Sequence, residues 1–195
     1  MVFDDDSYVN RSNIHKTITL PNVRAYPFKH TELSTGTFDT PFQRTIYLRE
    51  IIAGGQTIAG ELIIENLQPP SIKTMDLIQR IRFDIGFSLA AVLSLRSGDT
   101  NTGLEEFSKA CLFGVRCLEI LELKRFPVGY DEIYKLSNQV VSQPKYLGTI
   151  ESAYSLRNDA KSVEMDTIFE NISLLNFIEQ RIIAAFDANG DQILA

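Results

Sequence analysis

Apolar residues recur at helical spacing through most of the second half of the chain. They occupy about every third or fourth position over 74–97, 104–124, 130–142 and 162–187. This spacing gathers them on one face of each helix, which a globular protein buries. Residues 143–161 show no clear period. The pattern therefore predicts a helical body over 71–190, with about four helices closing one core.

A strand-like pattern comes earlier in the chain. Residues 14–20 alternate in the manner of a strand, and two β-branched runs, 44–52 and 56–65, flank a Gly-Gly pair. Two such runs around a Gly-Gly turn are typical of an antiparallel β-hairpin. The Pro69-Pro70 pair then marks a boundary, because proline disfavours helix at the residue before it.

These two patterns predict an α+β fold. We expect a flexible arm over 1–13 and a single domain over 14–195. Within that domain, a β-rich region over 14–68 forms a small antiparallel hairpin or sheet, and the helical body follows.

Charged residues interrupt the helix predicted over 74–97. Arg80 and Arg82 lie at pairing distance from Asp76 and Asp84 along the helix. We assign these four residues to its polar side.

Composition limits the classes of partner. The chain has 195 residues and a net charge of −6. Most of this negative charge lies in residues 151–195, which contain eight acidic and three basic residues. Such a segment repels phosphate, so a nucleic-acid partner is disfavoured. The segment is either a solvated helix face or an acidic docking surface for a basic partner.

The sequence shows no pattern typical of a signal peptide or a transmembrane helix. The N-terminus, Met1-Val-Phe-Asp-Asp-Asp, has no apolar core of a signal peptide, and no run reaches 18 apolar residues. We therefore expect a cytoplasmic protein without membrane insertion. Cys111 and Cys117 lie six residues apart on one predicted helix and point away from each other, so we expect two buried free thiols.

Candidate catalytic and metal-binding residues are few. The only histidines are His15 and His30, which are too few and too isolated for a His-centred metal site or a Ser-His-Asp relay. Neighbouring carboxylates occur at Glu105-Glu106 and over 4–6, where capping or solvation explains them. We therefore expect no metal and no cofactor, and we lean against an enzyme.

Aromatic residues cluster in the loop-rich N-terminal region. They are Tyr26, Phe28, Phe38, Phe42 and Tyr47, which we take as a possible interaction surface. With nearby arginines they could also form a base-stacking platform. However, residues 1–50 carry six bases and six acids, so no basic groove is expected there.

Four short stretches are similar, in their order, to the middle of phycobiliproteins. They are Arg82-Phe-Asp84, Gly98-Asp-Thr, Leu104-Glu-Glu and Phe126-Pro-x-x-Tyr130. The cysteine that anchors the bilin in that family has no counterpart just before Arg82, and the β-like N-terminal pattern differs from an all-helical fold. We therefore transfer no residue role or cofactor from this resemblance.

Three functions remain open. The first is a non-enzymatic protein-interaction or assembly protein that binds a protein partner or itself. The second is a small-molecule-binding domain or enzyme with a pocket between sheet and helices, for which Arg80, Arg82, Tyr130 and Tyr134 are candidate lining residues. The third is a nucleic-acid-binding accessory protein, possibly viral, which would need a clustered basic face.

Overall fold

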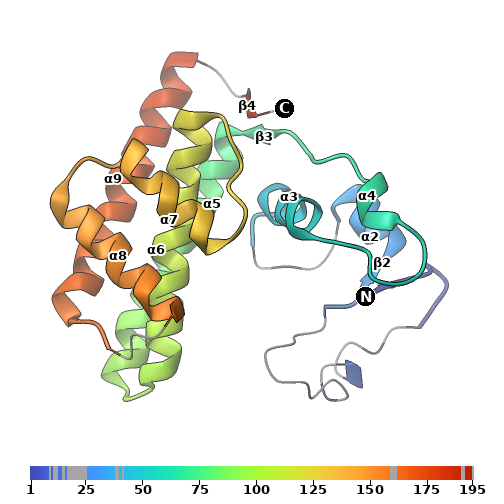
Figure 1. Ribbon diagram of the computed structural model, residues 1–195, viewed down its shortest axis with the longest axis horizontal. Helices are drawn as coiled ribbons and strands as arrows, with labels where there is room; N and C mark the ends of the chain where they lie inside the picture. Colours follow the sequence, from blue (N-terminus) through green and yellow to red (C-terminus); the bar gives the residue numbers. More distant parts are fainter. Residues whose placement is uncertain are drawn as a thin grey trace.

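The computed structural model describes residues 1–8, 10, 13–14, 16, 26–37, 40, 42–158, 162–189 and 192–194. In this part of the chain the fold is mainly helical, with a helical body and a smaller N-terminal part beside it (Figure 1). The broad prediction of a helical body is therefore confirmed.

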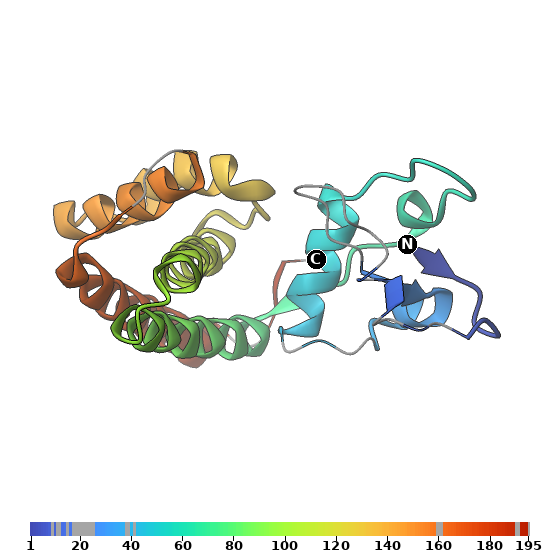
Figure 2. The same cartoon turned by 90° about the horizontal axis from the view of Figure 1, so that it is seen from below.

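Five helices form the body. They are α5 (Thr74–Arg96), α6 (Thr100–Leu123), α7 (Gly129–Val140), α8 (Pro144–Asn158) and α9 (Met165–Asn189). Helix α6 runs between α5 and α9 on one side and α7 and α8 on the other (Figure 2). This central position buries every residue of α6 from Gly114 to Leu121, including the charged Arg116 and Glu119.

The helix predictions differ from the structure in two details. Helix α8 lies where no period was visible, because its buried positions include the polar Thr149 beside Tyr146, Ile150 and Ala153. The start of α6 also differs from the capping expected at Glu105. The side chain of Asp99 caps this helix by accepting a hydrogen bond from the Thr102 amide at 3.2 Å, and Glu105 instead forms an ion pair with Lys109.

The predicted antiparallel hairpin is wrong. Residues 44–52 belong to helix α3 (Arg44–Gly54), and the second run forms a loop and the short helix α4 (Ile63–Asn66). Gln43 caps α3 by accepting a hydrogen bond from the Ile46 amide at 2.7 Å. Of the strand predicted over 14–20, residues 15 and 17–20 lie outside the described residues.

Short strands occur elsewhere. Strand β1 (Val2–Phe3) pairs in parallel with β2 (Phe28–Lys29), which leads into helix α2 (His30–Thr35). Strand β3 (Ile72–Lys73) pairs antiparallel with β4 (Gln192–Leu194), so the end of the chain returns to the start of α5. The predicted division into an arm over 1–13 and a domain over 14–195 stays a prediction.

Two apolar clusters lie on different sides of α3. Ile46 belongs to the large core of the helical body, whereas Leu48 packs with Leu33 in a small N-terminal cluster. Helix α3 therefore joins the two parts of the molecule (Figure 1). This double burial also explains the β-like sequence, because a helix with two apolar faces loses the clear stripe that marks an amphipathic helix.

Two further expectations bear on the body. Cys111 and Cys117 are both free and buried in α6, as predicted. No helix among the described residues is long and apolar enough to cross a membrane.

Candidate functional site

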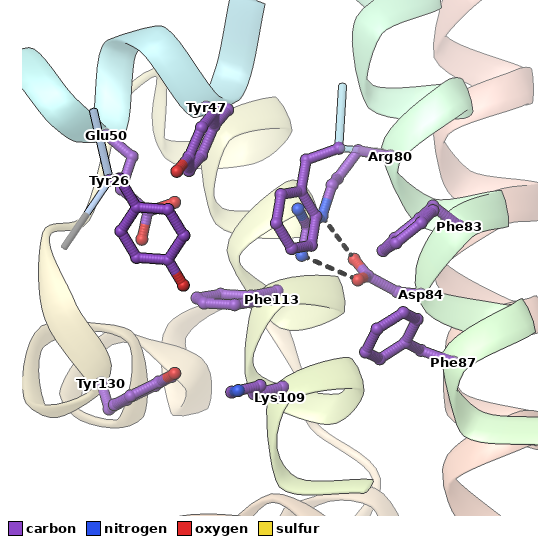
Figure 3. A pocket seen from close by; sticks show the side chains of 11 residues that line it. Tyr26, Tyr47, Glu50, Arg80, Phe83, Asp84, Phe87, Lys109, Phe113 and Tyr130 are labelled. Carbon is purple, nitrogen blue, oxygen red and sulfur yellow. Dashed lines mark hydrogen bonds and ion pairs between the residues drawn. The ribbon is translucent and has the colours of Figure 1, made fainter. Parts of the chain in front are cut away.

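A cavity of about 190 Å³ opens where α3 faces the helical body. Its walls come from α3, α5, α6, the start of α7 and two residues that precede α3 (Figure 3). The lining residues are Tyr26, Phe42, Tyr47, Glu50, Arg80, Phe83, Asp84, Phe87, Lys109, Phe113 and Tyr130. Seven of these eleven are aromatic, so the cavity presents mainly flat, weakly polar surfaces.

Helix α5 supplies the polar centre of this cavity. Phe83 and Asp84 lie three and four residues after Arg80, and Phe87 lies four and three residues after them, which places all four on one broad face. Arg80 donates from Nε to Oδ2 of Asp84 at 2.9 Å and from Nη2 to Oδ1 at 2.8 Å. Both side chains are at least 96% buried, so this is a two-point ion pair shielded from water.

Aromatic rings surround the Arg80 guanidinium. Its central carbon lies 4.8 Å from the ring centre of Phe113, 5.3 Å from that of Phe42 and 5.6 Å from that of Phe83. Rings at these distances attract a cation through their electron-rich faces. The third guanidinium nitrogen, Nη1, makes no hydrogen bond within the described part of the chain.

Burial and pairing act in opposite directions on Asp84. Burial raises the pKa of this carboxyl to about 6, and the neighbouring Arg80 limits the rise. For Arg80, burial acts to lower the pKa, but the Asp84 carboxylate raises it overall. The ion pair therefore persists at neutral pH and weakens as Asp84 takes up a proton in mild acid.

The remaining charges of the cavity are also compensated. Glu50 on α3 accepts a hydrogen bond at 3.1 Å from Nη2 of Arg116. The side chain of Arg116 is 99% buried. Lys109 forms an ion pair with Glu105 one turn earlier on α6. The lining itself carries two acids, Glu50 and Asp84, and two bases, Arg80 and Lys109, so its formal charge is zero.

Several residues predicted from the sequence meet at this cavity. Tyr26, Phe42 and Tyr47 from the expected interaction surface line it, together with Arg80 and Tyr130 from the expected pocket. Phe28 instead lies on β2 in the N-terminal cluster, and Phe38 lies outside the described residues.

The other two expected pocket residues lie elsewhere. Arg82 is largely exposed and donates to Glu179 of α9 at 2.7 Å. Tyr134 stacks face to face on Tyr154, with ring centres 4.2 Å apart. Neither is among the residues that line the cavity.

Sequence reasoning named Arg80 as a possible pocket residue but missed Asp84 and its neighbours, because it placed both charged residues on the polar side of α5. Both are buried, which corrects that prediction. A signal was present, since Phe83 and Phe87 share their face of the helix. Bulky aromatic residues one turn apart on a supposed polar face indicate that the face is covered.

Neither metal-binding residues nor known relatives indicate what this cavity does. Among the described residues, no group of three or more His, Cys, Asp or Glu side chains could hold a metal ion. No family model, curated protein or solved structure matches the chain. The fold and the cavity therefore define a class only: a mainly helical protein with an aromatic pocket around a buried ion pair.

Proposed function

We propose that the protein binds a small planar molecule in the cavity between α3 and the helical body. The observation that carries this proposal is the Arg80–Asp84 ion pair, which is buried among aromatic rings and also lines a cavity. Charged groups are costly to bury, so an ion pair beside a cavity is typical of a site that recognises a ligand.

The size of the cavity limits the ligand. A cavity of about 150 Å³ can hold one benzene ring. The volume of about 190 Å³ here therefore suits one ring with a polar substituent, or two small fused rings. A larger molecule would have to extend past Tyr26, which is 48% exposed.

The chemistry of the lining limits the ligand further. The faces of Phe83, Phe87 and Phe113 favour a planar, conjugated molecule. Nη1 of Arg80 is a donor without an acceptor in the described chain, so it suits a carbonyl oxygen or a ring nitrogen. Because the lining charges cancel, an uncharged ligand suits the site better than an ion.

Binding is a better proposal than catalysis. Arg80 and Asp84 satisfy each other through two hydrogen bonds, so Asp84 is not free to act as a base or a nucleophile. Lys109 is likewise paired with Glu105.

A titration with two probes tests the proposal. 2-Quinolone is planar, uncharged and carries a carbonyl acceptor, whereas benzoate is a planar aromatic anion with one ring. We expect isothermal titration calorimetry to detect 2-quinolone binding, and Phe87→Leu to weaken it by about two- to tenfold through loss of stacking. Phe169→Leu, on the exposed side of α9, is the matched control and should leave binding unchanged. Equal affinities in the two variants would contradict the proposed site.

Native mass spectrometry of the protein from its own source gives a second test. A monomer that carries an extra mass equal to that of one or two small rings would support a bound small molecule. A clean multiple of 22.0 kDa without extra mass would instead favour the assembly hypothesis from the sequence.

A further inference from the structure

A second cavity lies in the N-terminal part, away from the aromatic pocket. Its volume is about 490 Å³, and it is bounded by β1, β2, α3, α4 and the loop between these two helices. Its apolar wall includes Val2, Phe28, Ile51 and Ile64. It shares no lining residue with the aromatic pocket, so an inference about it is independent of the proposed function.

The apolar cluster beneath this cavity is incompletely buried. Among its described members, only Leu33 and Leu48 are buried. The residues packed against them, including Val2, Phe28 and Ile51, keep part of their surface accessible. A cluster of this kind gains stability when another apolar group covers it, because burial of apolar surface is favourable.

The loop of residues 55–62 presents a further apolar side chain at this cavity. Ile58 lines it and is 95% exposed. The loop is held in place by Thr57, whose amide and hydroxyl donate to the Glu65 carboxylate at 2.9 and 2.6 Å. Ile58 therefore buries almost no surface within the folded chain, while its neighbour Thr57 is bound to Glu65.

Acidic residues surround the cavity. Asp4 and Glu61 line it and also line an adjoining hollow, which Asp5 borders as well. Asp5 accepts hydrogen bonds from the Thr31 amide and hydroxyl at 3.0 and 2.6 Å, and these bonds lower the pKa of its carboxyl. Two positive groups lie beside these three carboxylates: Lys29, which donates to the backbone carbonyl of Asp5 at 2.6 Å and keeps its charge, and the Met1 ammonium, so the carboxylates are in excess by one.

We infer that this cavity docks a short segment of a partner protein in which apolar side chains are flanked by lysine or arginine. The apolar side chains would cover Phe28 and Ile58, and the basic ones would face Asp4 and Glu61. Charge complementarity selects this occupant. Anionic lipid and nucleic acid are repelled by the carboxylates, and a second copy of the chain carries a net charge of −6.

The test uses the full chain and a synthetic peptide. The probe is an acetylated, amidated hexapeptide with two central leucines between two pairs of lysines. Calorimetry at 50 mM salt should detect its binding. Asp4→Asn combined with Glu61→Gln should weaken binding about three- to tenfold, and 500 mM salt should remove most of the difference. Ile58→Ser should weaken it about threefold or more without changing the melting temperature.

Matched controls separate this site from general acidity. Glu164→Gln combined with Asp166→Asn removes two exposed acids at the start of α9 and should leave peptide affinity unchanged. The same peptide with glutamates in place of lysines should not bind. Binding of 2-quinolone should persist in all these variants, since the aromatic pocket is elsewhere.

Three results would overturn the inference. One is equal peptide affinity in the Asp4/Glu61 variant and the Glu164/Asp166 control. Another is a dimer that sedimentation detects and that Ile58→Ser abolishes, because the occupant would then be a second copy. The last is tight binding of the uncharged detergent dodecyl maltoside that competes with the peptide and has the same affinity in the Asp4/Glu61 variant. This result would indicate a lipid-like occupant.

Discussion

Replacing Glu119 with glutamine is expected to stabilise the protein at neutral pH and to have little effect in acid. Glu119 lies on the central helix α6 and is completely buried. Neither of its carboxylate oxygens has a hydrogen-bond partner within the described residues. Burial raises the pKa of Glu119 to about 9, although the nearby Arg116 acts to lower it. The folded protein therefore holds this side chain in its protonated, uncharged form at pH 7.

The size of the effect follows from proton linkage. An unfolded chain releases the Glu119 proton near the ordinary pKa of 4.5, whereas the folded chain keeps it until about pH 9. Between these values the unfolded state binds fewer protons, so the free energy of unfolding falls by about 1.4 kcal/mol for each pH unit. At pH 7 the accumulated loss is about 3 kcal/mol. Glutamine has a similar shape and no proton to lose, so Glu119→Gln removes this loss.

Urea unfolding followed by far-UV circular dichroism measures the difference directly. The variant and the natural protein should have similar stability at pH 4.5 and diverge steadily up to pH 8. Glu122→Gln is the matched control, because Glu122 lies one turn further along α6 and pairs with Arg181 at the surface. Stability curves for Glu119→Gln and the natural protein that stay parallel from pH 4.5 to 8 would refute the reasoning.

Two further predictions concern packing. Asp84→Asn should lower the free energy of unfolding by about 3–5 kcal/mol, because it leaves the buried Arg80 guanidinium uncompensated, whereas Arg80→Met with Asp84→Leu should cost much less than the single change. A double variant as unstable as Asp84→Asn in urea would contradict this account. Gly114→Ala should cost about 1–3 kcal/mol, because its new methyl group would overlap Leu175 of α9. Gly86→Ala, with open space around it on α5, should gain about 0.5–1 kcal/mol from helix propensity. Equal melting temperatures for the two alanine variants would contradict close packing at Gly114.

The helical body could be predicted because apolar residues recur at helical spacing along most of its helices. Helices α5, α6, α7 and α9 were expected within a few residues of their observed bounds. Helix α8 could not be found in this way. Its buried face includes Thr149, whose hydroxyl donates to the carbonyl of Lys145 at 3.1 Å and so satisfies itself within the helix. A polar residue that is paired locally breaks the apolar pattern without breaking the helix.

The same limit applies to the ion pair at the centre of the candidate site. A sequence reading assigns Arg and Asp four residues apart to a solvated face, because most such pairs are exposed. On α5 the buried face instead includes Leu77, Ile81, Asp84 and Ser88. Ser88 is satisfied by Asn171 of α9, which donates to its hydroxyl at 3.0 Å. The Arg80–Asp84 pair is covered by Phe42 and Phe113 from other parts of the chain, and Ser88 depends on a partner from α9. Local spacing does not contain that information.

The aromatic pocket could be predicted from the sequence only if the segment 44–54 was recognised as helix α3. In a strand, residues three apart point to opposite faces, whereas in a helix they share one face. Tyr47 and Glu50 are three apart, and both line the aromatic pocket because this segment is helical. The hairpin prediction would have separated them and left the face of α5 with Arg80 and Phe83 uncovered. The error in one element therefore hid the site, because that element supplies the wall that turns a helix face into a pocket.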